Sequence, residues 1–297
     1  MDSLLRGAFD LHVHCSPDVV PRAQDMFDLA RAASESRMAG IGLKDHTTST
    51  VGRCHALNRM YPDGPRFFSS IALNPPVGGL NPSAVEAALS SGVDIVYFPT
   101  YSADHHIALF GTKLTPVPHP ADGFQRLSIL DENQRLLPQA RAIVELIAKN
   151  DAVLATGHIS PRETLVLLEF AKSRGIERMV VTHASQSVPD MAVDDQRACV
   201  AHGAMIEHCF LAVTECCPGT IPLESMVDQI RSVGARNVIL SSDFGQPSIG
   251  PPIEAFGQHA GRLLEMGLSE AELRLMLSDN PRQLVTNRRR ERANEAT

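Results

Sequence analysis

The residues of this chain best suited to chemistry are histidines at the ends of short apolar runs. The sequence holds 12 His among 297 residues, against 3 Tyr and no Trp. The polar residues at or near the ends of such runs are His12, His14, His46, His158, His183, His208 and Asp243. Neutral imidazoles and a carboxylate are the ligands that divalent ions such as zinc prefer. The pattern predicts a metal site if the fold brings these run ends together.

The apolar runs alternate with segments of helical periodicity along the chain. They cover residues 8–14, 39–46, 66–74, 93–100, 151–158, 178–183, 203–209 and 237–243. Several are continuously apolar, as expected for strands that are covered on both faces. Eight strands that each precede a helix predict an α/β fold, a (β/α)8 barrel. A doubly wound sheet is the competing architecture, but no Gly-x-Gly-x-x-Gly sequence follows the first run.

A barrel of this kind would place all the run ends at one face. The C-terminal ends of the strands meet there, and active sites lie on that face. Because alternate strand residues share a side, we expect His12 and His14 to point inward, as do Lys44 and His46 on the second run. A lone histidine at a strand end is more often a structural residue. The coincidence of several at one rim is what favours metal binding.

The length and spacing of the runs suggest one domain with an insertion. Residues 1–287 are expected to form the barrel, and 288–297 a charged tail without stable structure. Residues 101–137 follow the fourth run, are rich in proline and break the alternation. Because long loops of this kind are usually functional, we expect an inserted loop and small hairpin over the barrel mouth. Tyr101, at its start, is a candidate for substrate binding.

Composition excludes several classes of partner. Lys and Arg number 27 against 34 Asp and Glu, which gives a net charge of −7 and no overall basic field for nucleic acid. No apolar stretch approaches the roughly 20 residues of a membrane span, and the first residues lack a signal-peptide core. The six cysteines form no Cys-x-x-Cys pair. We expect a cytoplasmic protein with reduced thiols and a small-molecule substrate.

Five short motifs, in this order, resemble those of the amidohydrolase superfamily of metal-dependent hydrolases. They are Phe9-Asp10-Leu11-His12-Val13-His14, Ala155-Thr156-Gly157-His158, Val181-Thr182-His183-Ala184, Ser241-Ser242-Asp243 and Asp279-Asn280-Pro281-Arg282-Gln283-Leu284. The resemblance covers nearly the whole chain. It implies one or two divalent ions per chain, zinc or alternatively manganese. It also implies a homo-oligomer, because family members are often dimers or larger.

The resemblance also implies a ligand set. His12, His14 and Asp243 would hold one metal, and His158 and His183 would hold a second or support the first. Binuclear members usually carry a bridging Lys carbamate or Glu at the end of the fourth strand, whereas residues 97–100 here read Tyr-Phe-Pro-Thr. Two alternatives stay open. The site is mononuclear, or a side chain from another strand, Lys44 or Glu207, forms the bridge.

The reaction implied is attack of a metal-activated water on a cyclic amide, an amide or a lactone. The metal lowers the pKa of the bound water towards about 7. Asp243 would orient the hydroxide and carry its proton to the leaving group, while His183 or His46 would polarise the carbonyl. Metal-dependent decarboxylation of an aromatic acid is an alternative on the same barrel. Arg22, Lys44 and Arg162 are candidates for receiving a substrate carboxylate.

A second resemblance competes with the first. His12-Val13-His14 and Lys44-Asp45-His46-Thr47 are similar to the first two motifs of the polymerase-and-histidinol-phosphatase family, which implies a phosphoesterase with a multinuclear site. That family normally ends with an Asp-x-His motif. Here Asp243 is followed by Phe244-Gly245-Gln246, so the amidohydrolase resemblance is the stronger of the two.

Overall fold

The strands of the computed structural model lie where the apolar runs predict them. It describes residues 2–111, 125–216 and 219–286, so the expected tail and part of the expected insertion lie outside the described residues. The strands are β1 (Phe9–Val13), β2 (Gly40–Leu43), β3 (Arg66–Phe68), β4 (Ser70–Ala72), β5 (Ile95–Tyr97), β6 (Val153–Ala155), β7 (Met179–Val181), β8 (Met205–Cys209) and β9 (Val238–Ser241). β3 and β4, separated by Ser69 alone, together form the expected third strand.

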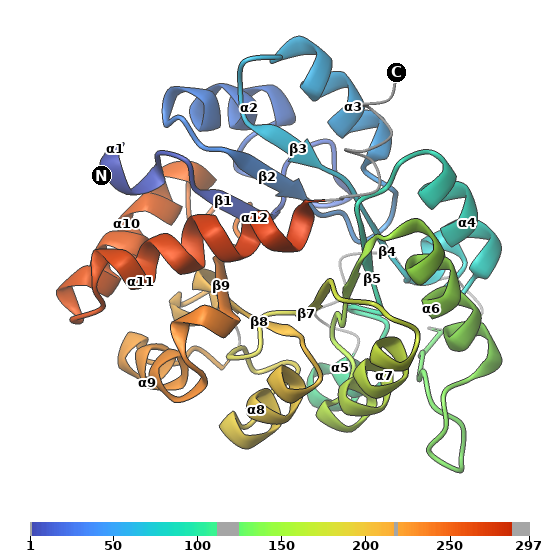
Figure 1. Cartoon of the computed structure of the whole chain (residues 1–297). Coiled ribbons are helices and arrows are strands. Elements are labelled where there is room, and N and C mark those ends of the chain that lie inside the picture. The colour runs from blue at the N-terminus through green and yellow to red at the C-terminus, as the bar shows by residue number, and fades with distance from the viewer. Residues whose placement is uncertain (1, 112–124, 217–218, 287–297) are drawn as a thin grey trace.

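All the strand pairs are parallel and follow one another around a ring (Figure 1). One sheet has the order β1-β2-β3 and the other runs from β4 to β9. β9 returns beside β1, where the Asp243 N–H donates to His12 O and the His14 N–H donates to Phe244 O, both at 2.8 Å. The expectation of a TIM-barrel-type α/β fold is therefore confirmed.

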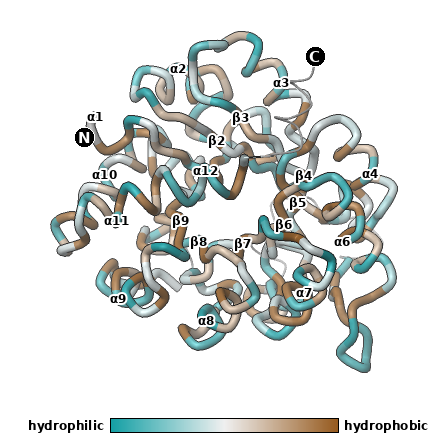
Figure 2. The backbone as a smooth tube through the Cα atoms, viewed as in Figure 1, coloured by the Kyte–Doolittle hydropathy of each residue, from teal (hydrophilic) through white to brown (hydrophobic). Residues whose placement is uncertain are grey.

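The helices form the outer layer. The longer ones are α2 (Met26–Glu35), α3 (Val51–Met60), α4 (Pro82–Ser90), α6 (Pro138–Asn150), α7 (Pro161–Ser173), α8 (Val193–Ala201), α9 (Leu223–Val233) and α10 (Pro252–Glu265). Shorter helices are α1 (Asp2–Leu5), α5 (Asp104–Phe110), α11 (Glu270–Arg274) and α12 (Asn280–Val285). Each amphipathic helix buries its apolar stripe against the strands, so the tube is brown towards the barrel and teal outside (Figure 2).

The N-terminal end of the barrel is covered by α12. This helix crosses the ring in Figure 1, and its Leu284 and Val285 pack in one apolar cluster with Phe9, Ile95 and Val153. Phe9, Ile95 and Val153 are the first residues of their strands, so this part of the cluster fills the N-terminal end of the barrel. The histidine-bearing ends of the strands lie at the opposite face.

The inserted segment after β5 is anchored at both ends. The Leu127 N–H donates to Ser102 O and the Asp104 N–H donates to Leu127 O, both at 2.8 Å. Between these anchors lies α5, which the sequence pattern did not indicate. Beyond them, Leu130 and Leu136 form an antiparallel bridge around a turn, the small hairpin that was expected. The lid expected over 101–137 is described only in part, because 112–124 lie outside the described residues.

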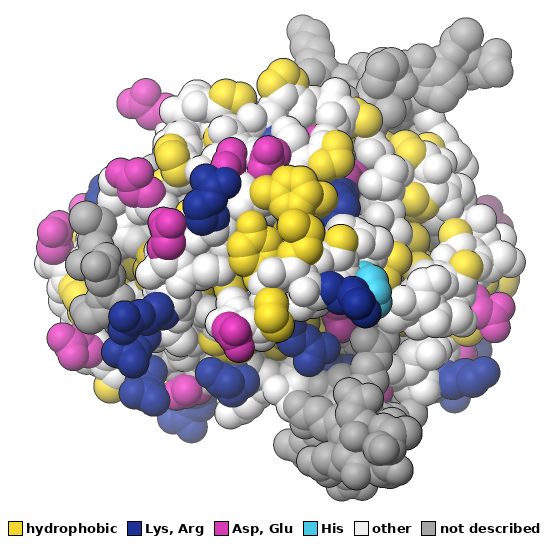
Figure 3. Space-filling view, turned by 90° about the horizontal axis from the view of Figure 1, so that it is seen from above, with side chains coloured by type: hydrophobic (Ala, Val, Ile, Leu, Met, Phe, Trp, Pro, Cys, Tyr) yellow, Lys and Arg dark blue, Asp and Glu magenta, His cyan; other side chains and the backbone are white. Residues whose placement is uncertain are grey.

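The surface carries a few exposed apolar side chains. Hydrophobic groups gather among charged ones on the face above α2 and α3 (Figure 3), where Phe27 and Met60 are exposed. Within residues 2–111, 125–216 and 219–286, no helix has both the length and the apolar character needed to cross a bilayer.

Candidate metal centre

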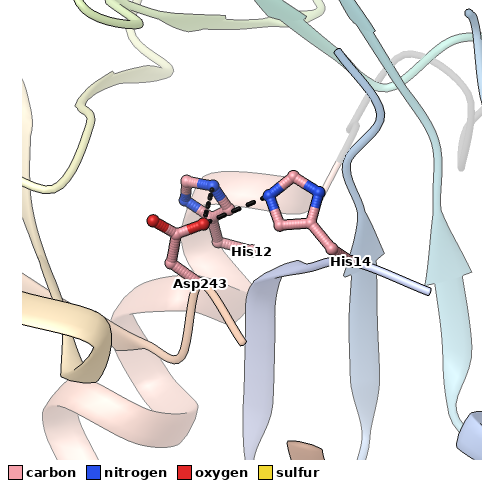
Figure 4. A group of neighbouring side chains, drawn as sticks. All are labelled: His12, His14 and Asp243. Atoms are coloured by element: carbon pink, nitrogen blue, oxygen red, sulfur yellow. Dashed lines mark hydrogen bonds and ion pairs between the residues drawn. The ribbon is translucent and has the colours of Figure 1, made fainter. Parts of the chain in front are cut away.

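Three side chains from the two ends of the chain converge at the rim between β1 and β9. One oxygen of Asp243, Oδ1, lies 3.1 Å from His12 Nε2 and 3.1 Å from His14 Nε2 (Figure 4). All three residues are buried, and their ligand atoms lie within 4.8 Å of one another. Two imidazole nitrogens and a carboxylate oxygen in this arrangement can hold a divalent ion, with positions left open for water or substrate.

Two further side chains hold these ligands in place. Glu207 Oε2 lies 3.0 Å from His12 Nδ1 and also accepts from the backbone N–H of His183 at 3.1 Å. Gln186 Nε2 donates to Asp243 Oδ2 at 3.1 Å. A carboxylate on the far nitrogen of a ligating histidine fixes the ring and its tautomer. Glu207 therefore orients the His12 ring. In this arrangement its carboxylate contacts the ring nitrogen Nδ1, on the side of the ring away from the candidate ligand atom Nε2, and it does not bridge two ions.

Lys44 lies against the same cluster. Its Nζ is 2.9 Å from His12 Nε2 and 4.7 Å from the centre of the Tyr97 ring, and the side chain is buried. Burial lowers the pKa of Lys44, although Asp243 and Glu207 oppose that effect. The structure brings Lys44 into contact with His12, a candidate ligand, as the inward parity of the second run predicts.

A second group of imidazoles lies beside the first. The rings of His158 and His183 meet edge to face at 4.7 Å, and His46 stacks on His14 at 5.0 Å. His46 Nδ1 is 2.9 Å from Thr100 Oγ1. His158 Nδ1 is 2.9 Å from Nδ1 of His106, a residue of α5. The rim thus carries one histidine group with a carboxylate and another without one.

The protonation states of these groups suit cation binding. Burial lowers the pKa of His14 and of His183 to about 3, so both rings are neutral at pH 7. Burial raises the pKa of Asp243, but His12, His14 and Lys44 together hold it well below its usual value. Nδ1 of His183 is buried and has no hydrogen-bond partner in the described part of the chain. Because metal ligands must be deprotonated, the states of His14, His183 and Asp243 fit a divalent ion, whereas Asp243 and Glu207 raise the pKa of His12, which would lose its proton on binding one.

The backbone at these positions is unusual. His183 and Asp243 have φ values of 32° and 56°, in the left-handed region that residues with a Cβ rarely adopt. The β1–β2 register shifts between Asp10 and Val13, around His12. Strain and strand irregularities of this kind concentrate at functional sites. The local geometry is thus consistent with a site at the rim.

Members of both groups, His14 and Asp243 of the first and His46 and His158 of the second, line a cavity of about 220 Å³ together with Arg22. The Arg22 side chain is 6% exposed, and its Nε donates to Asp18 Oδ2 at 2.8 Å. The loop that carries Arg22 is tied to the loop after β9, since the Ala23 N–H donates to Gly245 O at 2.9 Å. The guanidinium is therefore positioned beside the candidate ligands.

Other sequence candidates lie elsewhere. Arg162 is exposed at the start of α7 and lines a separate depression with Arg135, because its side chain points away from the barrel. The structure does not bring it to the cavity. Tyr101 is buried behind His46, with ring centres 5.8 Å apart. His208, at the end of β8, faces away from the cavity because its neighbour Glu207 faces in.

Several residues that line the cavity were not among the candidates, and Gln186 and His106 are two of them. Gln186 follows His183 in a tight turn, in which the Gln186 N–H donates to His183 O at 2.9 Å. His106 follows His105 directly, and adjacent histidines rarely converge on one ion. They do diverge: His105 Nε2 is 3.0 Å from Pro189 O, while His106 faces His158. The only signal in the sequence was their place shortly after β5.

The comparisons with known proteins agree with this architecture. Residues 7–207 match a protein family described as "Family of unknown function (DUF6282)". The chain belongs to this family. No curated protein sequence matches it.

Solved structures with the same fold include an amidohydrolase from Pseudomonas aeruginosa, at a TM-score of 0.63 and 10% identity over 96% of this chain and 97% of that one. A putative 2-pyrone-4,6-dicarboxylic acid hydrolase from Pseudomonas putida has a TM-score of 0.58 and 13% identity, with coverages of 94% and 97%. For 2,6-dihydroxybenzoate decarboxylase from Rhizobium the TM-score is 0.53 and the identity 14%, with coverages of 94% and 98%. At these identities the likeness establishes the fold, which is the one that the sequence motifs imply.

Proposed function

We propose that the protein is a metal-dependent hydrolase that cleaves an amide, cyclic amide or lactone bond in a small molecule. The observation that carries the proposal is the convergence of His12 Nε2, His14 Nε2 and Asp243 Oδ1 beside a cavity at the barrel rim. Hydrolases with this fold, such as the amidohydrolase from P. aeruginosa, support the reaction class. We further propose that the ion is zinc, with manganese as the alternative.

A divalent ion held by these residues would supply hydroxide at neutral pH and polarise the substrate carbonyl. Asp243 has a second oxygen, Oδ2, which Gln186 holds and which is positioned to take the proton of the attacking water and deliver it to the leaving group. The ring of His46 lines the cavity and that of His183 contacts His158, and we propose that one of them orients the carbonyl oxygen. The low pKa of His183 means that it would do so as a neutral imidazole.

Arg22 gives the substrate a preferred charge. Asp18 holds its Nε, so the two terminal amino groups of the guanidinium remain for a carboxylate, which they can bind in a bidentate manner. Lys44 lines the same cavity as Arg22 and adds a second basic side chain to it. The cavity of about 220 Å³ is below the usual range for drug-sized ligands, which is roughly 300–1,000 Å³. We therefore propose a small carboxylated substrate, of about the size of one ring.

Metal-dependent decarboxylation is the second candidate. The end of β5 offers no bridging ligand, since Thr100 Oγ1 contacts His46 and Asn74. Glu207 is engaged with His12. A site with a single cation and a carboxylated ring beside Arg22 would suit decarboxylation as well as hydrolysis, and the decarboxylase from Rhizobium has the same fold.

The phosphoesterase alternative has less support. Its second motif would require Asp45 beside His46 at the metal site. Asp45 instead accepts hydrogen bonds from the backbone of Thr47 and Thr48 and pairs with Arg53. Its carboxylate therefore faces α3 and is not available to a cation at the rim.

The test is a substrate panel with zinc- and manganese-loaded protein. The panel would contain lactones, cyclic amides, hydroxybenzoates and phosphate monoesters, each class in versions with and without a carboxylate substituent. The products would be identified by mass spectrometry. A carboxylated lactone or amide should turn over, whereas carbon dioxide release from a hydroxybenzoate would identify the second candidate.

Asp243→Asn should lower kcat by about 10²–10⁴-fold while the fold is kept, because the proton acceptor is lost. The matched control is Asp63→Asn, which changes an exposed carboxylate remote from the rim. Full activity of Asp243→Asn, or protein that binds no divalent ion, would disprove the proposal.

A further inference from the structure

A small hydrogen-bond network lies behind one of the imidazoles that line the cavity. His46 Nδ1 is 2.9 Å from Thr100 Oγ1, which in turn is 2.6 Å from Asn74 Nδ2. Asn74 and Thr100 are both 0% exposed. They follow the paired strands β4 and β5, which bring them side by side. The direction of each hydrogen bond in this network decides which nitrogen of His46 carries hydrogen.

The backbone fixes the orientation of the Asn74 amide. Asn74 Oδ1 accepts from the Thr100 N–H at 3.0 Å, and Asn74 Nδ2 donates to His46 O at 3.0 Å. A backbone N–H can only donate and a backbone carbonyl can only accept, so the two ends of the amide cannot be exchanged. Ser102 Oγ donates to the same Asn74 oxygen at 2.7 Å. Asn74 Nδ2 is therefore also a donor towards Thr100 Oγ1.

The Thr100 hydroxyl then has a single acceptor for its own hydrogen. In the described part of the chain, its oxygen forms hydrogen bonds with Asn74 Nδ2 and His46 Nδ1 and with no other atom. If Nδ1 also carried hydrogen, both neighbours would donate to Thr100 and its buried hydroxyl hydrogen would have no acceptor. Buried polar groups seldom stay unpaired in this way. Thr100 therefore donates to Nδ1, and the hydrogen of the neutral His46 ring lies on Nε2.

The contrast with His12 shows what this means for function. The partner of His12 Nδ1 is the carboxylate of Glu207, which can only accept, so the hydrogen of the neutral ring lies on Nδ1 and Nε2 keeps a lone pair for a cation. On His46 the two positions are reversed. Burial lowers the pKa of His46 well below its usual value, and protonation would only add hydrogen at Nδ1. The structure thus makes His46 Nε2 a hydrogen-bond donor and not a metal ligand.

This donor is placed beside the candidate ligands. The His46 ring stacks on that of His14 with 5.0 Å between centres, and both rings line the cavity. Nε2 of His46 has no hydrogen-bond partner among the described residues. A carbonyl group held next to His14 could therefore accept a hydrogen bond from this nitrogen.

We propose that His46 polarises the substrate carbonyl through its Nε2–H, and that Thr100 and Asn74 are positioning residues that keep the hydrogen on this nitrogen. The proposal rests on the proposed function, because it assigns roles within that reaction. As water adds to the carbonyl carbon, the π electrons of the C=O bond move to oxygen, and the N–H donates to the charge that develops there. The C=O bond forms again when the bond to the leaving nitrogen or oxygen breaks. The hydrogen stays on Nε2 throughout.

NMR of the ring nitrogens tests where the hydrogen lies without any turnover. In full-length protein with ¹⁵N-labelled histidine at pH 7, Nε2 of His46 should give the signal of a nitrogen that carries hydrogen, and Nδ1 that of one that does not. The signals would be assigned by their loss in His46→Gln. Added Zn²⁺ should leave the pattern in place. Hydrogen on Nδ1, or coordination of Zn²⁺ by Nε2, overturns the proposal.

Thr100 variants test the positioning role by the same measurement. Thr100→Val keeps the shape but removes the hydroxyl, so the His46 nitrogen signals should become averages of the two tautomers. Thr100→Ser keeps the hydroxyl and should restore the wild-type pattern. Thr164→Val is the matched control, because Thr164 is equally buried and its hydroxyl has no partner among the described residues. A wild-type pattern in Thr100→Val overturns the positioning role.

His46 variants separate a donor from a metal ligand. His46→Gln keeps an N–H donor close to the position of Nε2, whereas His46→Leu has none. For a substrate found in the panel, kcat should stay within about tenfold of the wild type in His46→Gln and fall by about 10²–10³-fold in His46→Leu. Elemental analysis should find as much zinc in both variants as in the wild type.

The outcomes separate this inference from the proposed function. Equal kcat in His46→Gln and His46→Leu, or loss of zinc from both, overturns the role of His46 while the wild type still hydrolyses its substrate. A wild type that binds no divalent ion and hydrolyses nothing in the panel disproves the proposed function, and the catalytic role of His46 with it, whatever the NMR pattern.

Discussion

At the scale of single residues, His12 shows how the centre is organised. Its Nε2 faces Asp243, and its Nδ1 is 3.0 Å from Glu207. Burial raises the pKa of Glu207, but the charge and hydrogen bond of His12 outweigh burial and bring it to about 2. Glu207 is therefore an anion at any pH at which the protein works. At the proposed metal site it would act on the cation only through the ring of His12, as a positioning residue.

Replacing Glu207 with Gln should weaken Zn²⁺ binding by about 10–100-fold, because the partner of a ligating histidine loses its charge while its shape is kept. Affinity would be measured by competition with a chelating dye. Glu224→Gln, at an exposed position in α9, is the control and should bind Zn²⁺ as the wild type does. Unchanged affinity in Glu207→Gln would show that His12 needs no such support.

At the scale of elements, two short segments position the histidines. Gly157, between β6 and His158, has a φ of 67°, and a Cβ there would lie 2.3 Å from Phe98 O. Glu163, in the first turn of α7, accepts from Ser128 Oγ and the Ile129 N–H, each at 3.0 Å. Its other oxygen completes a capping box with Ser160. The β6–α7 turn is thus fixed on one side to β5 and on the other to the inserted segment.

Gly157→Ala should destabilise the protein by about 2–4 kcal/mol, because a left-handed backbone and a clash with a neighbouring carbonyl are combined. Gly175→Ala is the control, because Gly175 has a φ of 75° but open space around the new Cβ. It introduces the backbone strain without the clash and should lower the free energy of unfolding by about 1–2 kcal/mol. Denaturant unfolding measures both. Equal losses in the two variants would mean that the contact with Phe98 O does not constrain the turn.

Glu163→Ala should lower the free energy of unfolding by about 1 kcal/mol, because the cap of α7 is lost. It should also speed proteolysis within residues 101–137, because the hydrogen bonds that anchor Ser128 and Ile129 are removed. Glu272→Ala removes the equivalent capping box of α11, which has no contact of this kind with the insertion. It should lower stability similarly without the new cleavage. Identical digestion patterns for the two variants would contradict the anchoring role.

At the scale of the whole molecule, buried neutral histidines make stability depend on pH. His14 and His183 have folded-state pKa values of about 3, whereas the unfolded chain has values near 6.5. Between these pH values the unfolded state binds more protons, so the free energy of unfolding falls as pH is lowered. His12 acts in the opposite sense, because its pKa is raised by Asp243 and Glu207 against the effects of burial and Lys44.

The free energy of unfolding of the cation-free protein should therefore fall between pH 7 and pH 5. The fall should be about 2 kcal/mol for each of the two histidines whose pKa is lowered, and His12 should offset part of it. Urea unfolding at pH 7, 6 and 5 after chelation measures the loss. Adding Zn²⁺ should raise stability at each pH, since a ligand that binds only the folded state stabilises it. Equal or greater stability at pH 5 than at pH 7 without metal would contradict this linkage.

The barrel and the core of the candidate centre could be predicted from local patterns in the sequence. Alternating apolar runs and helical stripes are local patterns, and they placed the strands within a few residues of their observed bounds. His12, His14 and Asp243 could be assigned to one rim because strand ends converge in a parallel barrel whatever its loops do. The same rule placed Lys44 at the rim.

The side chains that surround the candidate ligands could not be predicted in this way and follow from the packing of the whole chain. Glu207 rather than His208 contacts His12, Arg162 lines a separate depression, and Gln186 and His106 reach the cavity from a loop and from α5. These outcomes depend on the stagger between strands and on the path of the connecting segments. Both are set by packing between elements far apart in the chain, so no local period in the sequence encodes them.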